Sequence, residues 1–373
     1  MSDNKPVIYA NFINRRSIAA PVSIPIPNRV TINTDLRQIS DSFDFEITYR
    51  LSDKVDLASH DFVEFYFMNG SERFQIMCGF VEDFVKETSS NTHKFQANGR
   101  DFMGQLFNLP FFLASPFKLT DLVALAKYAT QDAYQAVYLA TTPIKRRVVP
   151  NGCWAGPTNI PLLTDSKRAP ILQSVCDDVY SVPYQNRFGQ LVLWGRNSPA
   201  EFHTGLTLSE KSDQNVIKMV VRQNFSKVFS LVKALYTSGL NATDVANETG
   251  AKFAYNSEPL ARHIIQPEIR TFQSSSLIAT GGAVDFANGA LKLAASIMRK
   301  SNQNLLQVVV STSRPYFVGV DGVRTPYEKN QIWNISAPSY QVDRPMRLVG
   351  ISYVQDEASL RVELMFIIID SLI

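Results

Sequence analysis

The amino-acid sequence predicts an α+β protein that is mainly β, in which two antiparallel β units flank a small α/β module. Three observations predict this class. The 373 residues include 24 Phe and 14 Tyr, which favour pleated and half-buried surfaces. Apolar residues alternate with period two near both ends of the chain, as half-buried strands require. Two amphipathic helical patterns stand between these regions and separate the two β units.

The composition is that of a globular chain, with 45% hydrophobic and 19% charged residues, and the length predicts two or three domains. The net charge of +3 is too small to indicate specific binding to nucleic acid or to an anionic membrane. The start of the sequence has no signal-peptide pattern, and the longest apolar runs are too short to span a bilayer. We therefore expect a soluble protein without membrane insertion.

Residues 1–28 are interpreted as an extended N-terminal arm. Three prolines, Pro21, Pro25 and Pro27, disfavour a helix and favour extended backbone. In an assembly, such an arm is free to reach a neighbouring subunit.

Residues 29–110 are predicted to form the first β unit. Phe43, Phe45, Ile47 and Tyr49 alternate with polar residues and therefore share one face of a strand. Similar runs follow along the chain, so this region is expected to form an antiparallel meander that closes into a barrel or a sandwich.

A hairpin and a short helix are expected within the first β unit. Asn69-Gly70 stands between two alternating runs, and this dipeptide is typical of a tight hairpin turn. The alternation ends near residue 99, and residues 99–108 fit one or two helical turns.

Residues 111–204 are predicted to form the small α/β module. A helix is expected from residue 119 with Thr120 as its N-cap, a strand over 133–143, and a second helix from Pro170. Residues 145–169 are expected to form a loop, and the runs on either side of 185–189 are expected to pair as a hairpin. The buried stripes of the two helices are predicted to contain Leu122, Leu125, Ala126, Ala129, Leu172, Val175, Cys176 and Val179.

Residues 205–373 are predicted to form the second β unit, with an insertion at about 237–304. The polar stretch 237–282 is interpreted as an insertion or a mobile excursion. A helix is expected over 283–300, and the last two strands are expected to form a hairpin across 355–358. The buried side of the helix is predicted to contain Val284, Leu291, Ala295 and Met298.

The search for chemistry finds no catalytic, cofactor-binding or metal-ligating residues. The histidines lack metal-ligand spacing, so we expect structural or solvated roles, with a metal or acid/base role as the alternative. Adjacent acids and a short basic run are expected to be solvated surface charge, with contact to an acidic partner as the alternative for the basic run. The cysteines are expected to be reduced. The residues considered are His60, His93, His203, His263, Glu82-Asp83, Asp177-Asp178, Asp356-Glu357, Lys145-Arg146-Arg147, Cys78, Cys153 and Cys176.

The order of these elements and four short motifs resemble a known family. Arg100-Asp101 opens a helix after the first β unit, and residues 119–129 read LTDLVALAKYA. The run GQLVLWGR covers Gly189 to Arg196, and a hydrophobic strand near the end contains Trp333. From about residue 29 onward, the chain resembles the baseplate hub proteins of contractile bacteriophage tails, the gpP-like tail hub family. Neither the N-terminal arm nor the 237–282 excursion matches a feature of that family.

The resemblance implies a structural virion protein, not an enzyme, that works without cofactors. Each subunit of such a hub has two β-barrels similar to the tail-tube subunit, so that a homotrimer forms a ring of six barrels. This ring joins a six-fold tail tube to a three-fold central spike and surrounds the tail channel. The implied partners are the tail tube or tube-initiator protein, the central spike protein and the baseplate wedge proteins. The expected location is the tail baseplate of the virion, after assembly in the host cytoplasm.

Three points stay open at this stage. The first is the function, for which two alternatives to the tail hub are considered. One is the hub part of a secretion-system spike, although no needle-like sequence follows the last strand. The other is a cell-wall-acting enzyme or a carbohydrate-binding tail protein. Leu193 and Trp194 are expected in a core or docking surface, and Arg196 in a structural salt bridge. The residues of the subunit interface are not identified by the sequence.

Overall fold

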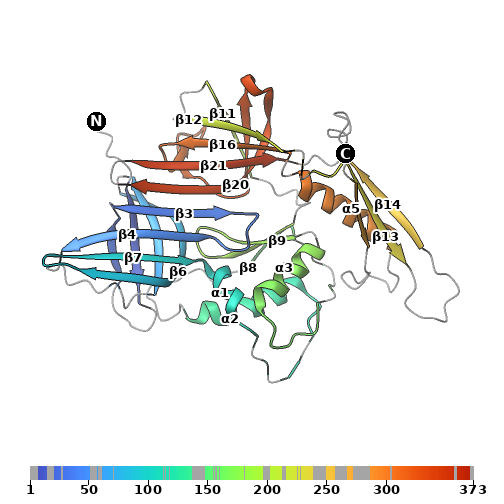
Figure 1. Ribbon diagram of the computed structural model, residues 1–373, viewed down its shortest axis with the longest axis horizontal. Helices are drawn as coiled ribbons and strands as arrows, with labels where there is room; N and C mark the ends of the chain where they lie inside the picture. The colour runs from blue at the N-terminus through green and yellow to red at the C-terminus, as the bar shows by residue number, and fades with distance from the viewer. Residues whose placement is uncertain are drawn as a thin grey trace.

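The structure is a computed structural model. It describes residues 7–14, 21–26, 28–50, 57, 61–69, 71–111, 113, 115–116, 118–136, 148–153, 155, 158, 160–179, 181–195, 202–211, 216–224, 226, 228–237, 249–256, 267–271, 286–302, 305–356 and 359–369. Figure 1 shows two groups of long strands side by side, with a cluster of short helices next to one group and a smaller sheet projecting at one end.

The largest sheet in the described part of the chain has 13 strands. They are β1 (Ile8–Ile13), β2 (Val22–Pro25), β3 (Arg29–Asp35), β4 (Ser42–Arg50), β5 (Phe62–Asn69), β6 (Glu72–Thr88), β7 (Thr92–Arg100), β11 (Phe202–Ser209), β12 (Val216–Gln223), β16 (Leu306–Thr312), β19 (Gln331–Ala337), β20 (Val342–Asp356) and β21 (Leu360–Ile368). Their order is β12-β16-β21-β20-β3-β4-β7-β6-β5-β1-β2, with β19 pairing β20 and β11 pairing β19. A mainly β fold is therefore confirmed.

The first half of this sheet, β1 to β7, curls around a core of phenylalanines. Phe45 on β4 contacts Phe65 on β5 and Phe12 on β1, with ring centroids 5.7 and 5.5 Å apart. At least two strands separate β4 from either partner in the sheet order, so these contacts require a strongly curved sheet. The predicted hairpin is confirmed, because β5 and β6 pair from Asn69↔Glu72 onward; Gly70 lies outside the described residues. Closure of this half into a barrel stays a prediction.

The described residues of the predicted N-terminal arm, 7–14 and 21–26, are extended as predicted, but they belong to the first half of the sheet and do not form a free arm. β1 pairs with β5 and with β2, and Ile8, Ala10 and Phe12 are buried. The three side chains alternate as in a strand. Their burial in the core stabilises this strand, although the local sequence pattern is weak. Pro25 lies on β2 at the sheet edge, where a missing backbone N–H costs no ladder hydrogen bond.

The two halves of the sheet are continuous through β3 and β20. These strands pair antiparallel from Gly350↔Asp35 to Asp356↔Arg29. The pairing continues beyond β3, where the Leu36 N–H donates to the Val349 carbonyl at 2.6 Å. The sequence predicted two separate β units; the pairing of residues more than 300 positions apart instead makes them one sheet.

The second half of the sheet contains β11, β12, β16 and β19 to β21, and the terminal hairpin of β20 and β21 is confirmed. Trp333 on β19 is fully buried, and its ring meets Phe317 edge-on with centroids 4.7 Å apart. Phe317 belongs to a small hairpin of β17 (Tyr316–Val318) and β18 (Arg324–Pro326). One turn of 3-10 helix, η5 (Pro338–Tyr340), connects β19 to β20.

The α/β module contains a three-stranded sheet in the order β8-β10-β9, with three helices beside it. Its elements are α1 (Phe102–Asn108), α2 (Leu122–Ala136), β8 (Val148–Asn151), α3 (Arg168–Asp178), β9 (Ser181–Gln185) and β10 (Leu191–Gly195). The predicted hairpin is confirmed as β9 and β10, and the eight predicted stripe residues of α2 and α3 are all buried.

Three local predictions in the module are wrong. The N-cap of α2 is Asp121, whose carboxylate accepts the Ala124 N–H, and not Thr120. Residues 133–136 of the predicted strand 133–143 belong to α2, because the Ala and Gln residues there continue a helix already stabilised by packing; residues 137–143 lie outside the described part. β8 lies within the predicted loop 145–169 and pairs parallel with β10.

The insertion forms a second three-stranded sheet, in the order β14-β13-β15, with α5 packed on it. Its elements are β13 (Leu231–Thr237), β14 (Thr249–Tyr255), β15 (Pro267–Thr271) and α5 (Phe286–Asn302). In Figure 1, α5, β13 and β14 project together at one end of the molecule. Described parts of the predicted excursion are thus regular strands, and the predicted helix is present.

The buried side of α5 agrees with the prediction at Met298 and differs from it at Leu291. Ala290, Ala294 and Met298 are buried against Val232 and Ala234 of β13, whereas the predicted Leu291 is 44% exposed. Small side chains let the helix approach the sheet closely, so the alanines face it. Val284 lies outside the described residues.

Candidate functional site

The residues considered for chemistry lie apart from one another. His93 on β7 hydrogen bonds to Thr88, with 2.9 Å between Nδ1 and Oγ1, and His203 lies exposed on β11. His60, His263 and residues 145–147 lie outside the described part. Within that part, no group of three or more His, Cys, Asp or Glu side chains is arranged to hold a metal, and no helix has both the length and the apolar character to cross a membrane.

The paired acids and the cysteines also serve local structure. Glu82 forms an ion pair with Arg100 at 2.8 Å, and Asp356 accepts the Ser359 N–H in the terminal hairpin turn. Cys78, Cys153 and Cys176 are free thiols. Burial raises the pKa of the Cys78 thiol well above its usual value, so this cysteine is a poor nucleophile.

The strongest concentration of buried charge lies where the two halves of the sheet meet the module. Lys329, just before β19, donates to Asp41, just before β4, at 2.6 Å, and both side chains are 5% exposed. Asp41 also accepts the Asp35 N–H at 3.0 Å. Burial raises the pKa of Asp41, and the Lys329 ammonium opposes that rise. This pair ties the first half of the sheet to the second.

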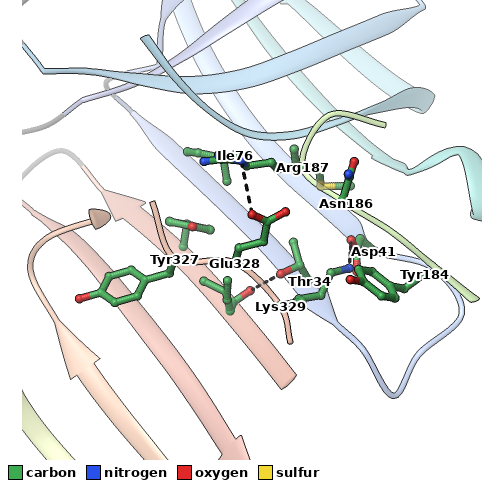
Figure 2. Close-up of a pocket in the computed structure, with 12 residues that line it drawn as sticks. Thr34, Asp41, Ile76, Tyr184, Asn186, Arg187, Tyr327, Glu328 and Lys329 are labelled. Carbon is green, nitrogen blue, oxygen red and sulfur yellow. Dashed lines mark hydrogen bonds and ion pairs between the residues drawn. The ribbon is translucent and has the colours of Figure 1, made fainter. Parts of the chain in front are cut away.

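Side chains of the module complete this polar junction, as Figure 2 shows. Arg187, from the β9–β10 turn, faces Glu328 at 3.9 Å, and Lys329 lies 5.4 Å from the centroid of the Tyr184 ring on β9. Burial raises the pKa of Glu328. The space between these side chains is about 20 Å³, room for about one water molecule and too small for an organic substrate. The junction is therefore suited to holding three units together, not to turnover.

Asp101 is a second buried carboxylate near this junction. It caps α1, because its Oδ1 accepts the Gly104 N–H at 2.9 Å and the Ser40 hydroxyl at 2.7 Å. Its Oδ2 is buried without a hydrogen-bond partner. Burial, together with the nearby charge of Asp41, raises the pKa of Asp101 to about 7. The Arg-Asp helix start predicted from the sequence is thus an N-cap with an unusually weak acid.

The module is fixed to both halves of the sheet. Gln185 at the end of β9 accepts the Phe102 N–H at 2.8 Å and donates to the Cys78 carbonyl at 2.9 Å. Leu193 is buried inside the module, and Trp194 packs with Val349 of β20 in a cluster joining module and second half. Both predicted positions are confirmed as core; Arg196 lies outside the described residues.

The main sheet also presents a polar face, opposite its apolar core. Ion pairs join Arg29 to Asp44 and Lys94 to Glu46, at 2.9 and 3.3 Å, across neighbouring strands. At the seam, Ser352 of β20 donates to Asn33 of β3 at 2.7 Å, and the neighbouring position on β21 is Glu363. Exposed ion pairs contribute little to stability, so this face is adapted to water.

Two of the edges that the described strands leave unpaired carry charged side chains. No described strand pairs with β12 on the side away from β16, and β12 carries the exposed cations Lys218 and Arg222. Residues 82–88, the distal segment of β6, pair with β7 alone among the described strands, because pairing with β5 ends at Phe80. This segment carries Glu82, Asp83 and Glu87 against one lysine. The two edges therefore have opposite charge.

Comparison with solved structures gives fold likenesses that cover nearly the whole chain. The 43 kDa tail protein of prophage MuSo2 from Shewanella oneidensis is 15% identical, with a TM-score of 0.67 and 97% of each chain covered. A tail protein from Neisseria meningitidis is 16% identical, with a TM-score of 0.69, covering 98% of this chain and 97% of the other. An Escherichia coli type VI secretion component that is similar to T4 bacteriophage tail proteins gp27 and gp5 is 8% identical, with a TM-score of 0.50, covering 91% and 73%.

The resemblance to tail proteins expected from the sequence is confirmed at the level of the fold. No protein-family model and no curated protein sequence matches the chain. The likeness thus rests on the arrangement of strands and helices. The two tail proteins share this arrangement although their sequences are only 15 and 16% identical to that of this chain.

Proposed function

We propose that the protein is a structural subunit of a bacteriophage tail baseplate and forms the homotrimeric hub that joins the six-fold tail tube to the three-fold central spike. The fold likeness to phage tail proteins supports a role in the tail. Two sheet halves in one chain support the trimer, because three copies then present six such halves to a six-fold partner.

The observation that carries this proposal is the continuous sheet with oppositely charged edges. Eight neighbouring strands run from β12 through the β20–β3 seam to β6. An unpaired strand edge is a template for another chain. Pairing the basic β12 edge of one copy with the acidic distal segment of β6 on the next is a head-to-tail contact, which closes into a ring when the rotation permits.

In such a ring, the polar face of the sheet lines the tail channel. Its cations and anions alternate across strands, as in the Arg29–Asp44 and Lys94–Glu46 pairs, so the lining is hydrated without a strong charge of either sign. The buried charges at the polar junction are already paired with one another, which supports a structural role rather than catalysis. The tail tube or tube-initiator protein, the spike and the wedge proteins are the proposed partners.

Sedimentation equilibrium of the purified chain tests the ring. We expect a trimer, and electron micrographs along its axis should show six lobes with three-fold symmetry. In the double variant K218E/R222E, the dissociation constant of the trimer should be at least tenfold higher. Adding D83K/E87K to this variant should restore assembly. Lys127→Glu, on the exposed side of α2, is the matched control. A strict monomer at high concentration would overturn the proposal.

The fold likeness to the type VI secretion component supports a second candidate, the hub part of a secretion-system spike. Mass spectrometry of purified particles separates the two. If the protein is a tail hub, it should be present in phage virions at three copies per tail. If it is a secretion hub, it should be present in secretion-system particles and absent from virions.

A further inference from the structure

The sheet of the insertion has one covered face and one open face. Val232 and Ala234 of β13 point to α5 and are fully buried. The alternate residues of the three strands point the other way, and no described residue packs over them. We call this surface the insertion face; it comprises Leu235, Phe253, Tyr255 and Ile269, with Lys233 among them.

The insertion face is mainly apolar. Tyr255 and Ile269 are 68% and 62% exposed, and Phe253 is 41% exposed. The Phe253 and Tyr255 rings stack with centroids 6.3 Å apart, and the Lys233 ammonium lies 5.9 Å from the Phe253 centroid. Contiguous exposed apolar surface rimmed by charge is typical of a protein–protein contact.

The place of the insertion in the chain indicates its partner. The insertion leaves the main sheet after β12 and returns through α5 directly into β16, the strand beside β12. It therefore starts at the same edge that the proposed ring pairs with a neighbouring copy. A chain paired along β12 would lie beside the start of the insertion.

The distal segment of β6 on a neighbouring copy has the matching chemistry. Its residues Asp83, Val85 and Glu87 alternate with Phe84 and therefore share one face of the strand, on which Val85 is 51% exposed. The aliphatic Val85 matches the apolar residues of the insertion face, and a carboxylate of Asp83 or Glu87 matches Lys233. Strand pairing uses the backbone edge of this segment and leaves these side chains available.

We propose that the insertion face binds the distal segment of β6 on the neighbouring copy and acts as a clamp that strengthens each subunit contact. This inference rests on the proposed ring. The clamp closes after edge pairing has set the register, so it strengthens the contact without defining which edges meet.

Variants on the insertion face test the clamp. Tyr255→Ser with Ile269→Ser should raise the dissociation constant of the trimer at least tenfold in sedimentation equilibrium. Lys233→Glu should weaken it similarly. Val320→Ser is the control, because Val320 is 86% exposed at a hairpin tip away from this face. Hydrogen exchange on α5 verifies that the insertion stays folded.

A photo-reactive amino acid at position 255 identifies the occupant directly. We expect a cross-link to a peptide containing residues 82–88 of another copy. A cross-link to any other peptide, or an unchanged dissociation constant in the double variant, would overturn the clamp. The ring itself is judged separately by K218E/R222E, so a trimer that depends on β12 but not on the insertion face rejects the clamp alone.

Discussion

The main sheet and the insertion sheet are built from similar strands, but they bury them differently. In the main sheet, the apolar face encloses large rings such as Phe45 and Trp333, which are fully buried. In the insertion, α5 covers one face through small residues such as Ala290 and Ala294, and the other face stays open. Burial of large apolar side chains provides most of the stability of a fold. The main sheet therefore carries the stability, and the insertion offers surface for contact.

Polar groups differ between the two regions in the same way. The main sheet and the module enclose the Lys329–Asp41 pair, where removal of one partner leaves a buried charge. The charge on the insertion face is Lys233, a partly exposed side chain over an aromatic ring. Substitutions in the body are thus expected to change folding, and substitutions on the insertion face to change association.

The largest expected effect is in the main core. Trp333→Ala should lower the free energy of unfolding by about 3–5 kcal/mol, because it leaves a cavity against Phe317 and Tyr327. Urea denaturation at constant m-value measures it. Tyr340→Ala, at a side chain that is 51% exposed, should change stability by less than about 0.5 kcal/mol. Equal losses from both variants would contradict the assigned core.

The polar junction should come next. Lys329→Met leaves Asp41 buried without its counter-charge and should cost about 3 kcal/mol. Adding Asp41→Asn removes the buried charge while keeping an oxygen for the Asp35 N–H, so the double variant should regain most of the loss. A double-mutant cycle in urea provides the comparison, and simple additivity would argue against a direct pair.

A smaller and local effect is expected in the insertion. Met298→Ala should cost about 2 kcal/mol, at the low end for a buried methionine, because the cluster around it is small. Hydrogen exchange should quicken in β13 and α5 while β20 and β21 keep their protection. Faster exchange throughout the chain would mean that the insertion and the main sheet unfold as one unit.

The last expected effect depends on pH. Asp101 keeps its proton up to about pH 7 in the folded state, whereas an unfolded aspartate loses it near pH 4. The folded state therefore binds the extra proton between these values, and stability falls as pH rises through that window. Asp101→Asn should flatten this part of the urea stability profile. An unchanged slope would show that other groups cause it.

Local patterns predicted many elements because their signals lie within a few residues. The period of two in residues 43–49, the hairpin of β5 and β6 and the stripes of α2 and α3 are all present in the structure. The pairing of the N-terminal residues with the sheet was not predicted, because the alternation of Ile8, Ala10 and Phe12 is brief and nearby prolines favour a free extended segment. The prediction that Leu291 lies on the buried side of α5 was wrong, because the size of the residues that face each other on α5 and β13, and not hydrophobicity alone, set the packing.

The polar junction could not be predicted from any motif. Asp41 and Lys329 are 288 positions apart, and no spacing rule connects them. A lone Asp before a strand and a lone Lys before another gave no signal in the sequence. The edges of the sheet could not be predicted from the sequence either. Which strands lie at an edge depends on the strand order, in which β12 pairs with β16 on one side and with no described strand on the other.

By itself, the sequence determined the type and order of many of the elements, since alternation and helical stripes act over a few residues. Tertiary structure alone decided that β3 and β20 merge two units into one sheet, that residues 8–13 and 22–25 belong to it, and that one face of the insertion stays open. The physical reason is that backbone pairing and burial are satisfied globally. A strand accepts whichever distant partner completes its hydrogen bonds and covers its apolar face.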